Sequence, residues 1–193
     1  MDLIKIKVFP YFQFFYEMEE LGLNDENVEN TNMAFISIIE TQECLRYYLE
    51  EENIKHFFND HQNVLNLDFD DACDNILYNG HLFKTMTMNQ AEKAIDFIEE
   101  MVENHIDEIK IHCRAGVSRS RAFAEFIYRY CKEHNIDVEY DDRDKYTTLL
   151  NPSVLKKLNH AYWKKHGLNG YDEGIDYPEE LSNPQTKIIN TED

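Results

Sequence analysis

The segment His112-Cys113-Arg114-Ala115-Gly116-Val117-Ser118-Arg119-Ser120 combines residue types that can hold a phosphate group and attack it. A cysteine opens this loop and an arginine closes it, with five residues between them. When such a loop precedes a helix, its backbone N–H groups can turn inward as an anion-binding nest, beside the positive end of the helix dipole. The same field favours the ionised, nucleophilic form of the Cys113 thiol. The spacing therefore predicts a sulfur nucleophile beneath a bound oxyanion.

The other loop residues have separate physical roles in this interpretation. Arg119 offers a planar fork that can grip two phosphate oxygens and the charge that develops on them. Gly116 permits backbone conformations that a side chain would resist. Ser120 can donate a hydrogen bond to the thiolate, and His112 can bond nearby backbone and hold the loop in shape. The residues expected to contact the phosphate are Arg114, Ala115, Gly116, Val117, Ser118 and Ser120.

The flanking sequence predicts the strand–loop–helix unit that this chemistry needs. Residues 106–112 have the length and apolar content of a strand. Residues 120–134 carry an apolar stripe at helical spacing, formed by Ala122, Phe123, Phe126, Ile127, Tyr130 and Cys131. The loop between them is therefore expected at the end of a strand and at the N-terminus of a helix.

Further strand-like and helix-like segments alternate along the chain, which is typical of an α/β domain. We expect a central, mostly parallel sheet flanked by helices, within one domain at residues 1–167. Residues 168–193 carry seven acidic residues and one lysine and are expected to form an acidic C-terminal tail. The other expected strands are 3–9, 33–39 and 63–69. The other expected helices are one after an N-cap at Thr41 to about residue 49, 89–104, and one from Asn151-Pro152 to Gly167, while 22–32 and 72–87 are expected loops.

The pattern His-Cys-x5-Arg-Ser resembles the signature of the protein tyrosine phosphatase superfamily, and its form is most similar to the dual-specificity branch. The resemblance covers roughly residues 33–165. Rhodanese-like domains also use a cysteine-anchored loop, but the preceding His112 and the closing Arg119-Ser120 fit the phosphatases better. The resemblance implies a cysteinyl-phosphate intermediate, no cofactor and no metal.

The resemblance also implies a general acid, an aspartate on a loop that follows a strand before the cysteine. Here the strand at 63–69 runs into Asp70 and Asp71, with Asp74 close behind. Alignment of the strand ends favours Asp71, and the other two remain alternatives. Cys73 lies in the same loop and is most simply an ordinary loop cysteine, although an oxidative bond to Cys113 is conceivable.

The composition and charge of the chain disfavour several classes of binding partner. The formal net charge of −19 disfavours nucleic acid and anionic membranes. Four scattered cysteines and eight scattered histidines form no metal-ligand spacing. No apolar stretch has the length of a membrane span or a signal peptide, so a cytoplasmic location is expected.

The sequence thus predicts a cysteine-dependent phosphatase that acts on phosphotyrosine, and on phosphoserine or phosphothreonine, in a phosphorylated protein or peptide. Two alternatives stay open. One is a phosphate-binding pseudophosphatase that serves as a scaffold. The other is a phosphatase of a non-protein phosphoester, a phosphoinositide or an RNA 5′-phosphate. Among the variable loop positions only Arg114 is basic, which disfavours a phosphoinositide with several phosphates.

Overall fold

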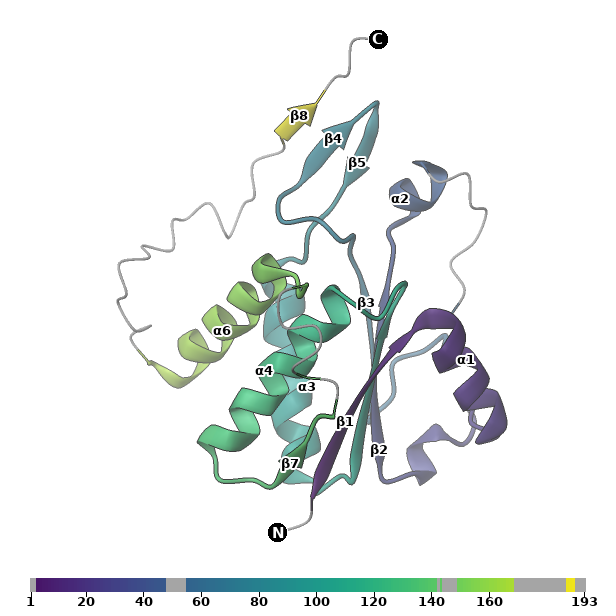
Figure 1. Cartoon of the computed structure of the whole chain (residues 1–193), viewed down its shortest axis with the longest axis vertical. Helices are drawn as coiled ribbons and strands as arrows, with labels where there is room; N and C mark the ends of the chain where they lie inside the picture. The colour runs from purple at the N-terminus through teal and green to yellow at the C-terminus, as the bar shows by residue number, and fades with distance from the viewer. Residues whose placement is uncertain (1–2, 48–54, 142, 144–148, 169–186, 190–193) are drawn as a thin grey trace.

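A five-stranded parallel sheet forms the centre of the protein (Figure 1). The computed structural model describes residues 3–47, 55–141, 143, 149–168 and 187–189. The strand order is β3-β2-β6-β1-β7, and all four neighbouring pairs run parallel. The strands are β1 (Ile4–Pro10), β2 (Met33–Ile39), β3 (Val64–Asp68), β6 (Glu108–Cys113) and β7 (Val138–Glu139). The predicted α/β class with a mostly parallel sheet is therefore confirmed.

Helices cover both faces of this sheet. Figure 1 shows α1 on one face and α3, α4 and α6 on the other. The helices are α1 (Tyr11–Glu20), α2 (Gln42–Tyr47), α3 (Met88–Glu103), α4 (Arg119–Glu133) and α6 (Pro152–His166), with one 3-10 turn at Val28–Asn30. None of the helices within the described ranges has the length and apolar character that a membrane crossing requires.

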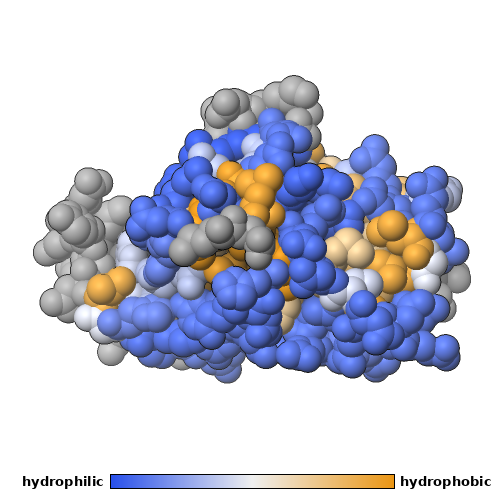
Figure 2. All heavy atoms as spheres, turned by 90° about the horizontal axis from the view of Figure 1, so that it is seen from below, coloured by the Kyte–Doolittle hydropathy of each residue, from blue (hydrophilic) through white to orange (hydrophobic). Residues whose placement is uncertain are grey.

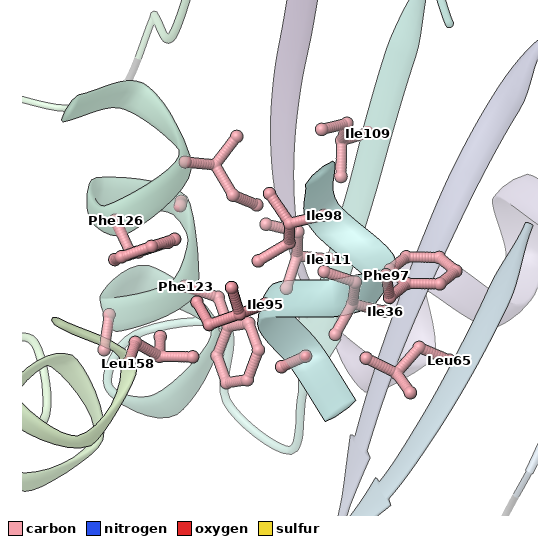
Figure 3. Close-up of a cluster of buried hydrophobic side chains, with 14 of the residues drawn as sticks. Ile36, Leu65, Ile95, Phe97, Ile98, Ile109, Ile111, Phe123, Phe126 and Leu158 are labelled. Atoms are coloured by element: carbon pink, nitrogen blue, oxygen red, sulfur yellow. The ribbon is translucent and has the colours of Figure 1, made fainter. Parts of the chain in front are cut away.

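The two faces bury two separate apolar clusters, which explains the continuous apolar sequence of β2. Ile36 packs with the residues of α3, α4 and α6 in the larger cluster, drawn in Figure 3. Its neighbour Phe35 points to the opposite face and packs with Phe14 of α1. Side chains alternate across a strand, so a strand with helices on both faces has no polar side to show.

Two helices begin with a side-chain cap, and the cap at Asn151 is the one of these two that the sequence predicted. Thr87 precedes α3 and forms a reciprocal capping box with Gln90. Asn151 precedes α6, and its side-chain oxygen accepts from the backbone N–H of Val154 at 3.1 Å. The same helix ends at Gly167, whose positive φ of 62° is the left-handed conformation that glycine adopts readily.

One helix and four strands were not expected from the sequence: α1, β4 (Ile76–Tyr78), β5 (His81–Phe83), β7 and β8 (Lys187–Ile189). Helix α1 occupies a segment for which no helix was predicted, and the expected loop at 72–87 contains a hairpin of β4 and β5. The strand β8 pairs parallel to β4 in this second, smaller sheet. Most of the predicted acidic tail lies outside the described residues, so the division at residue 167 stays a prediction. The expected loop at 22–32 contains the short 3-10 turn.

The carboxyl ends of the parallel strands all lie at one edge of the sheet, where β4 and β5 also lie (Figure 1). The segments that follow β1, β2, β3 and β6 therefore converge there, which is the usual location of a site in such a sheet. The opposite end of the molecule, seen in Figure 2, is mainly hydrophilic with smaller hydrophobic patches.

Candidate active site

The loop at residues 112–120 connects β6 to α4 at this carboxyl edge. Its Gly116 has a φ of 68°, and a Cβ built there would lie 2.4 Å from the backbone nitrogen of Pro10. The Arg121 side chain donates to the Gly116 carbonyl oxygen at 3.1 Å, and the Tyr11 N–H donates to the Arg114 carbonyl at 3.1 Å. The loop is thus pressed against the end of β1, and only glycine fits at its closest approach.

Cys113 ends β6 and lies at the base of the loop. The residue is 1% exposed, and its Sγ atom is 3.1 Å from the Oγ atom of Ser120, the contact expected from the sequence. Cys113 also interacts electrostatically with the guanidinium of Arg119. The sulfur is buried, but a hydroxyl and a cation accompany it, and both stabilise a thiolate.

Arg119 is the first residue of α4, and its guanidinium is held on two sides. Its Nη1 atom donates to the Phe69 carbonyl oxygen at 2.7 Å, and its Nη2 atom donates to Glu40 Oε1 at 2.5 Å. Burial opposes the charge of Arg119, but the charges of Glu40, Cys113 and Asp71 raise its pKa above the ordinary value. The guanidinium therefore stays cationic beside the sulfur.

The Nε–H of Arg119 has no hydrogen-bond partner among the described residues, although the residue is buried, with only 3% of its surface exposed. An unpaired buried donor costs about 1–3 kcal/mol, and a donor on a charged group costs more. A bound oxyanion would supply the missing acceptor and a compensating negative charge. This arrangement suits the predicted role of Arg119 as the phosphate clamp.

Sequence reasoning did not identify Glu40 as part of the site. This carboxylate directly follows β2, is largely buried, and forms the ion pair with Arg119 across 79 residues of sequence. The sequence did show that this acidic residue immediately follows a buried parallel strand, which is a common position for a site residue. It did not show that Arg119 is its partner, because the two residues are far apart in the chain.

The three candidate acids occupy different environments. Asp70 is 1% exposed, and its carboxylate accepts from the N–H and Oγ1 of Thr41 and from the N–H of Lys84 at 2.7–2.9 Å. Asp74 is half-buried and interacts with the amine of Lys157. Asp70 therefore anchors the segment that follows β3 to Thr41 and Lys84. Asp74 interacts instead with α6, which carries Lys157.

Asp71 is the candidate whose carboxylate contacts the loop. Its Oδ1 atom accepts from Ser118 Oγ at 2.7 Å and from Asn151 Nδ2 at 2.8 Å, and the residue is exposed. The buried Asp70 fixes the backbone immediately before it. Of the three aspartates left open by the sequence, this geometry favours Asp71 as the proton donor.

His112 does not make the expected backbone hydrogen bond. Neither of its ring nitrogens has a partner among the described residues, and its ring packs against Phe14, with ring centroids 4.2 Å apart, and against Tyr11. Burial, followed by the charges of Arg119 and His56, lowers the pKa of His112 to about 3. His112 therefore supports the loop as a neutral packing residue.

The remaining loop residues form its outer side. Arg114 and Ala115 are exposed, Val117 and Ser118 are half-buried, and Gly116 is buried. The four cysteines are all free, and the exposed Cys73 lies near Lys157. Within the described ranges, no three His, Cys, Asp or Glu side chains gather in a way that could hold a metal ion.

Comparison with known proteins yields matches among solved structures only. No family model matches the chain, and no curated protein sequence does. One similar structure is the human tyrosine phosphatase-like serine/threonine/tyrosine-interacting protein, at a TM-score of 0.44 and 18% identity, covering 83% of this chain and 92% of that chain. Another is PTPMT1 in complex with PI(5)P, at 0.40 and 12%, covering 84% and 93%.

The similarities are weak in both sequence and superposition. The fold class follows from the strand order, and the chemistry of the site follows from its own contacts.

Proposed function

We propose that the chain is a cysteine-dependent protein phosphatase, with Cys113 as nucleophile, Arg119 as phosphate clamp and Asp71 as general acid. One observation carries the proposal: the Arg119 guanidinium is fixed by Glu40 and Phe69, and its buried Nε–H has no acceptor among the residues that the structure describes. A phosphoryl oxygen that accepts from this N–H would complete the donor set, and the phosphorus atom that carries it would then be open to attack by the Cys113 sulfur.

In the first step, the Cys113 thiolate forms a bond to phosphorus while the bond from phosphorus to the leaving oxygen breaks. Asp71 gives its proton to that oxygen, which departs as a phenol or an alcohol. In the second step, Asp71 takes a proton from water, and the resulting nucleophile breaks the S–P bond. Inorganic phosphate leaves, and the Ser120 hydroxyl stabilises the returning thiolate.

The proposed substrate is a phosphorylated protein or peptide, with phosphotyrosine first and phosphoserine or phosphothreonine second. The exposed Arg114 is the single basic residue among the loop positions between Cys113 and Arg119. A substrate with several phosphates, such as a phosphoinositide, would need more cations than this loop offers.

The proposal is tested with the purified protein in the presence of a chelator. The substrates are p-nitrophenyl phosphate, a phosphotyrosine peptide, a phosphothreonine peptide and a phosphoinositide. Cys113→Ser should abolish turnover of every substrate, whereas the exposed Cys73→Ser control should retain it. Full turnover by Cys113→Ser would refute the mechanism.

The same assay separates the alternatives. A wild-type protein that binds inorganic phosphate without turning over any substrate would indicate a pseudophosphatase. Turnover confined to the phosphoinositide, or to an RNA 5′-phosphate added as a further substrate, would indicate a non-protein phosphoesterase. Turnover of the phosphotyrosine peptide at the highest kcat/KM is the result that the proposal predicts.

A further inference from the structure

Asn151 contacts both halves of the candidate site from the start of α6. Its side-chain Nδ2 donates to Asp71 Oδ1 at 2.8 Å, and its backbone N–H donates to the Ser118 carbonyl oxygen at 3.2 Å. Its own side-chain oxygen accepts from the Val154 N–H, and the residue is 4% exposed. The helix cap therefore fixes which end of the amide faces Asp71, because the oxygen is needed at the cap and only the nitrogen remains for the carboxylate.

Ser118 adds a second donor to the same oxygen. Its hydroxyl reaches Asp71 Oδ1 at 2.7 Å, so both hydrogen bonds that Asp71 accepts from the described residues end on Oδ1. An oxygen that accepts two hydrogen bonds is a poor place for a proton. The proton that Asp71 donates must therefore sit on Oδ2.

We infer that Asn151 is a positioning residue for the general acid: together with Ser118 it holds Asp71 Oδ1, directs the proton to Oδ2, and ties the acid loop to the phosphate loop. This inference rests on the proposed function. Asn151 also donates to the carboxylate that must accept a proton from water in the second step.

The test compares two substrates that differ in their need for a proton. Phenyl phosphate has a leaving group that must be protonated, whereas p-nitrophenolate leaves with little help. Asn151→Ser keeps a good capping hydroxyl but removes the donor to Asp71. We expect its kcat on phenyl phosphate to fall about tenfold, the value of one charge-assisted hydrogen bond, with a much smaller fall on p-nitrophenyl phosphate.

The pH profile gives a second readout that a merely structural role would not move. Without the Asn151 donor the Asp71 carboxylate is less favoured, so the alkaline limb of kcat should move to higher pH in Asn151→Ser. Asn151→Asp, of nearly the same size and also a good cap, sets a second carboxylate against Asp71 and should move the limb further. If Asn151→Ser fails to fold, Asn151→Asp carries the test.

Two comparisons distinguish an effect of Asn151 on the proposed acid Asp71 from an effect on the stability of α6. In an Asp71→Asn background, Asn151→Ser should have no further effect on the ratio of the two substrates. Thr87→Ala removes the corresponding cap of α3, where the Thr87 hydroxyl accepts from Gln90, and should lower the melting temperature without changing the ratio or the pH profile.

The inference is overturned if both Asn151 variants keep the wild-type substrate ratio and pH profile. In that outcome, wild-type turnover together with inactive Cys113→Ser would leave the proposed function standing. A wild-type protein without turnover of either substrate would refute both.

Discussion

Glu40 and Arg119 form a buried ion pair that joins the end of β2 to the first residue of α4, with Oε1 and Nη2 2.5 Å apart. Glu40 directly follows β2, the strand next to β6, so it reaches Arg119 from outside the loop at residues 112–120. The loop itself contains no carboxylate that could hold the guanidinium. The orientation of Arg119, the proposed phosphate clamp, therefore depends on a residue far from the signature in the sequence.

Glu40→Gln should weaken anion binding more than it weakens the fold. The Gln oxygen can still accept from Arg119, but loss of the charge weakens a charge-assisted hydrogen bond worth about 1.5–3 kcal/mol, so kcat/KM should fall roughly 10- to 100-fold. The affinity for tungstate, measured by the thermal shift it causes, should fall in parallel. Glu92→Gln is the matched control, because its pair with Lys164 is exposed and contributes little. Equal tungstate affinity in the Glu40 variant and the wild type would contradict this role.

Gly116→Ala should disrupt the loop. An added Cβ would lie 2.4 Å from the Pro10 nitrogen and 2.6 Å from the Phe9 carbonyl carbon, so backbone must move. Activity should fall more than tenfold, and a left-handed φ for alanine alone costs about 1–2 kcal/mol of unfolding free energy. Gly22→Ala has a similar φ of 64° with open space around it, and so reports the strain without the clash. Full activity in Gly116→Ala would show that the loop can relax.

Substitution of Asp71 should lower catalysis, whereas substitution of the adjacent Asp70 should lower stability. Asp71→Asn should lower kcat by roughly 10²- to 10⁴-fold, as expected for loss of a general acid, with little change in unfolding free energy. Asp70→Asn turns a carboxamide toward three donors from Thr41 and Lys84 and should lower the unfolding free energy by about 2–4 kcal/mol. Urea unfolding and steady-state kinetics on both variants measure this. The reverse pattern would assign the acid to Asp70.

His112 should make the fold sensitive to acid. Its pKa is lowered from 6.5 to about 3 by burial and by the charges of Arg119 and His56. As pH falls from 6.5 toward 3, the unfolded chain gains a proton that the folded protein does not, so stability falls by up to about 1.4 kcal/mol per pH unit. Above pH 6.5 this contribution to stability is complete.

His112→Phe should therefore show a shallower dependence of unfolding free energy on pH across that window. His105→Asn is the control, because this exposed residue has a φ of 56° that asparagine tolerates. Urea titrations at several pH values give the slopes. Equal slopes for wild type and His112→Phe would show that the ring is protonated in the folded state.

Much of the fold was predictable because its strongest elements have clear periodicity and caps. Helix α4 begins one residue before its predicted start, and α6 has its predicted cap at Asn151 and its predicted end at Gly167. Helix α1 escaped prediction because aromatic residues on both of its faces obscure the buried stripe of Tyr11, Phe14 and Met18. The sequence did contain a signal for the β4–β5 hairpin, the pair Asn79-Gly80, which is typical of a two-residue hairpin turn. Both residues have the positive φ that such a turn requires.

The part of the site formed by one continuous segment could be predicted from the sequence. The contacts between segments that are distant in the sequence could not. The loop from His112 to Ser120 could be read directly, because its residue types lie together in the sequence. The contacts of Glu40 with Arg119 and of Asn151 with Asp71 span 79 and 80 residues, and only the sheet topology brings them together. Asp70 and Asp71 are adjacent and chemically identical, so only their surroundings distinguish the buried Asp70 from Asp71, the proposed acid.

The most direct test of the central claim is a rapid-quench experiment with a radiolabelled phosphotyrosine peptide, followed by mapping of the protein-bound label. We expect the label on the peptide that contains Cys113, at a higher level in Asp71→Asn with a substrate that leaves readily, and its absence in Cys113→Ser. Turnover without protein-bound phosphate, or with the label on a residue other than Cys113, would contradict the account.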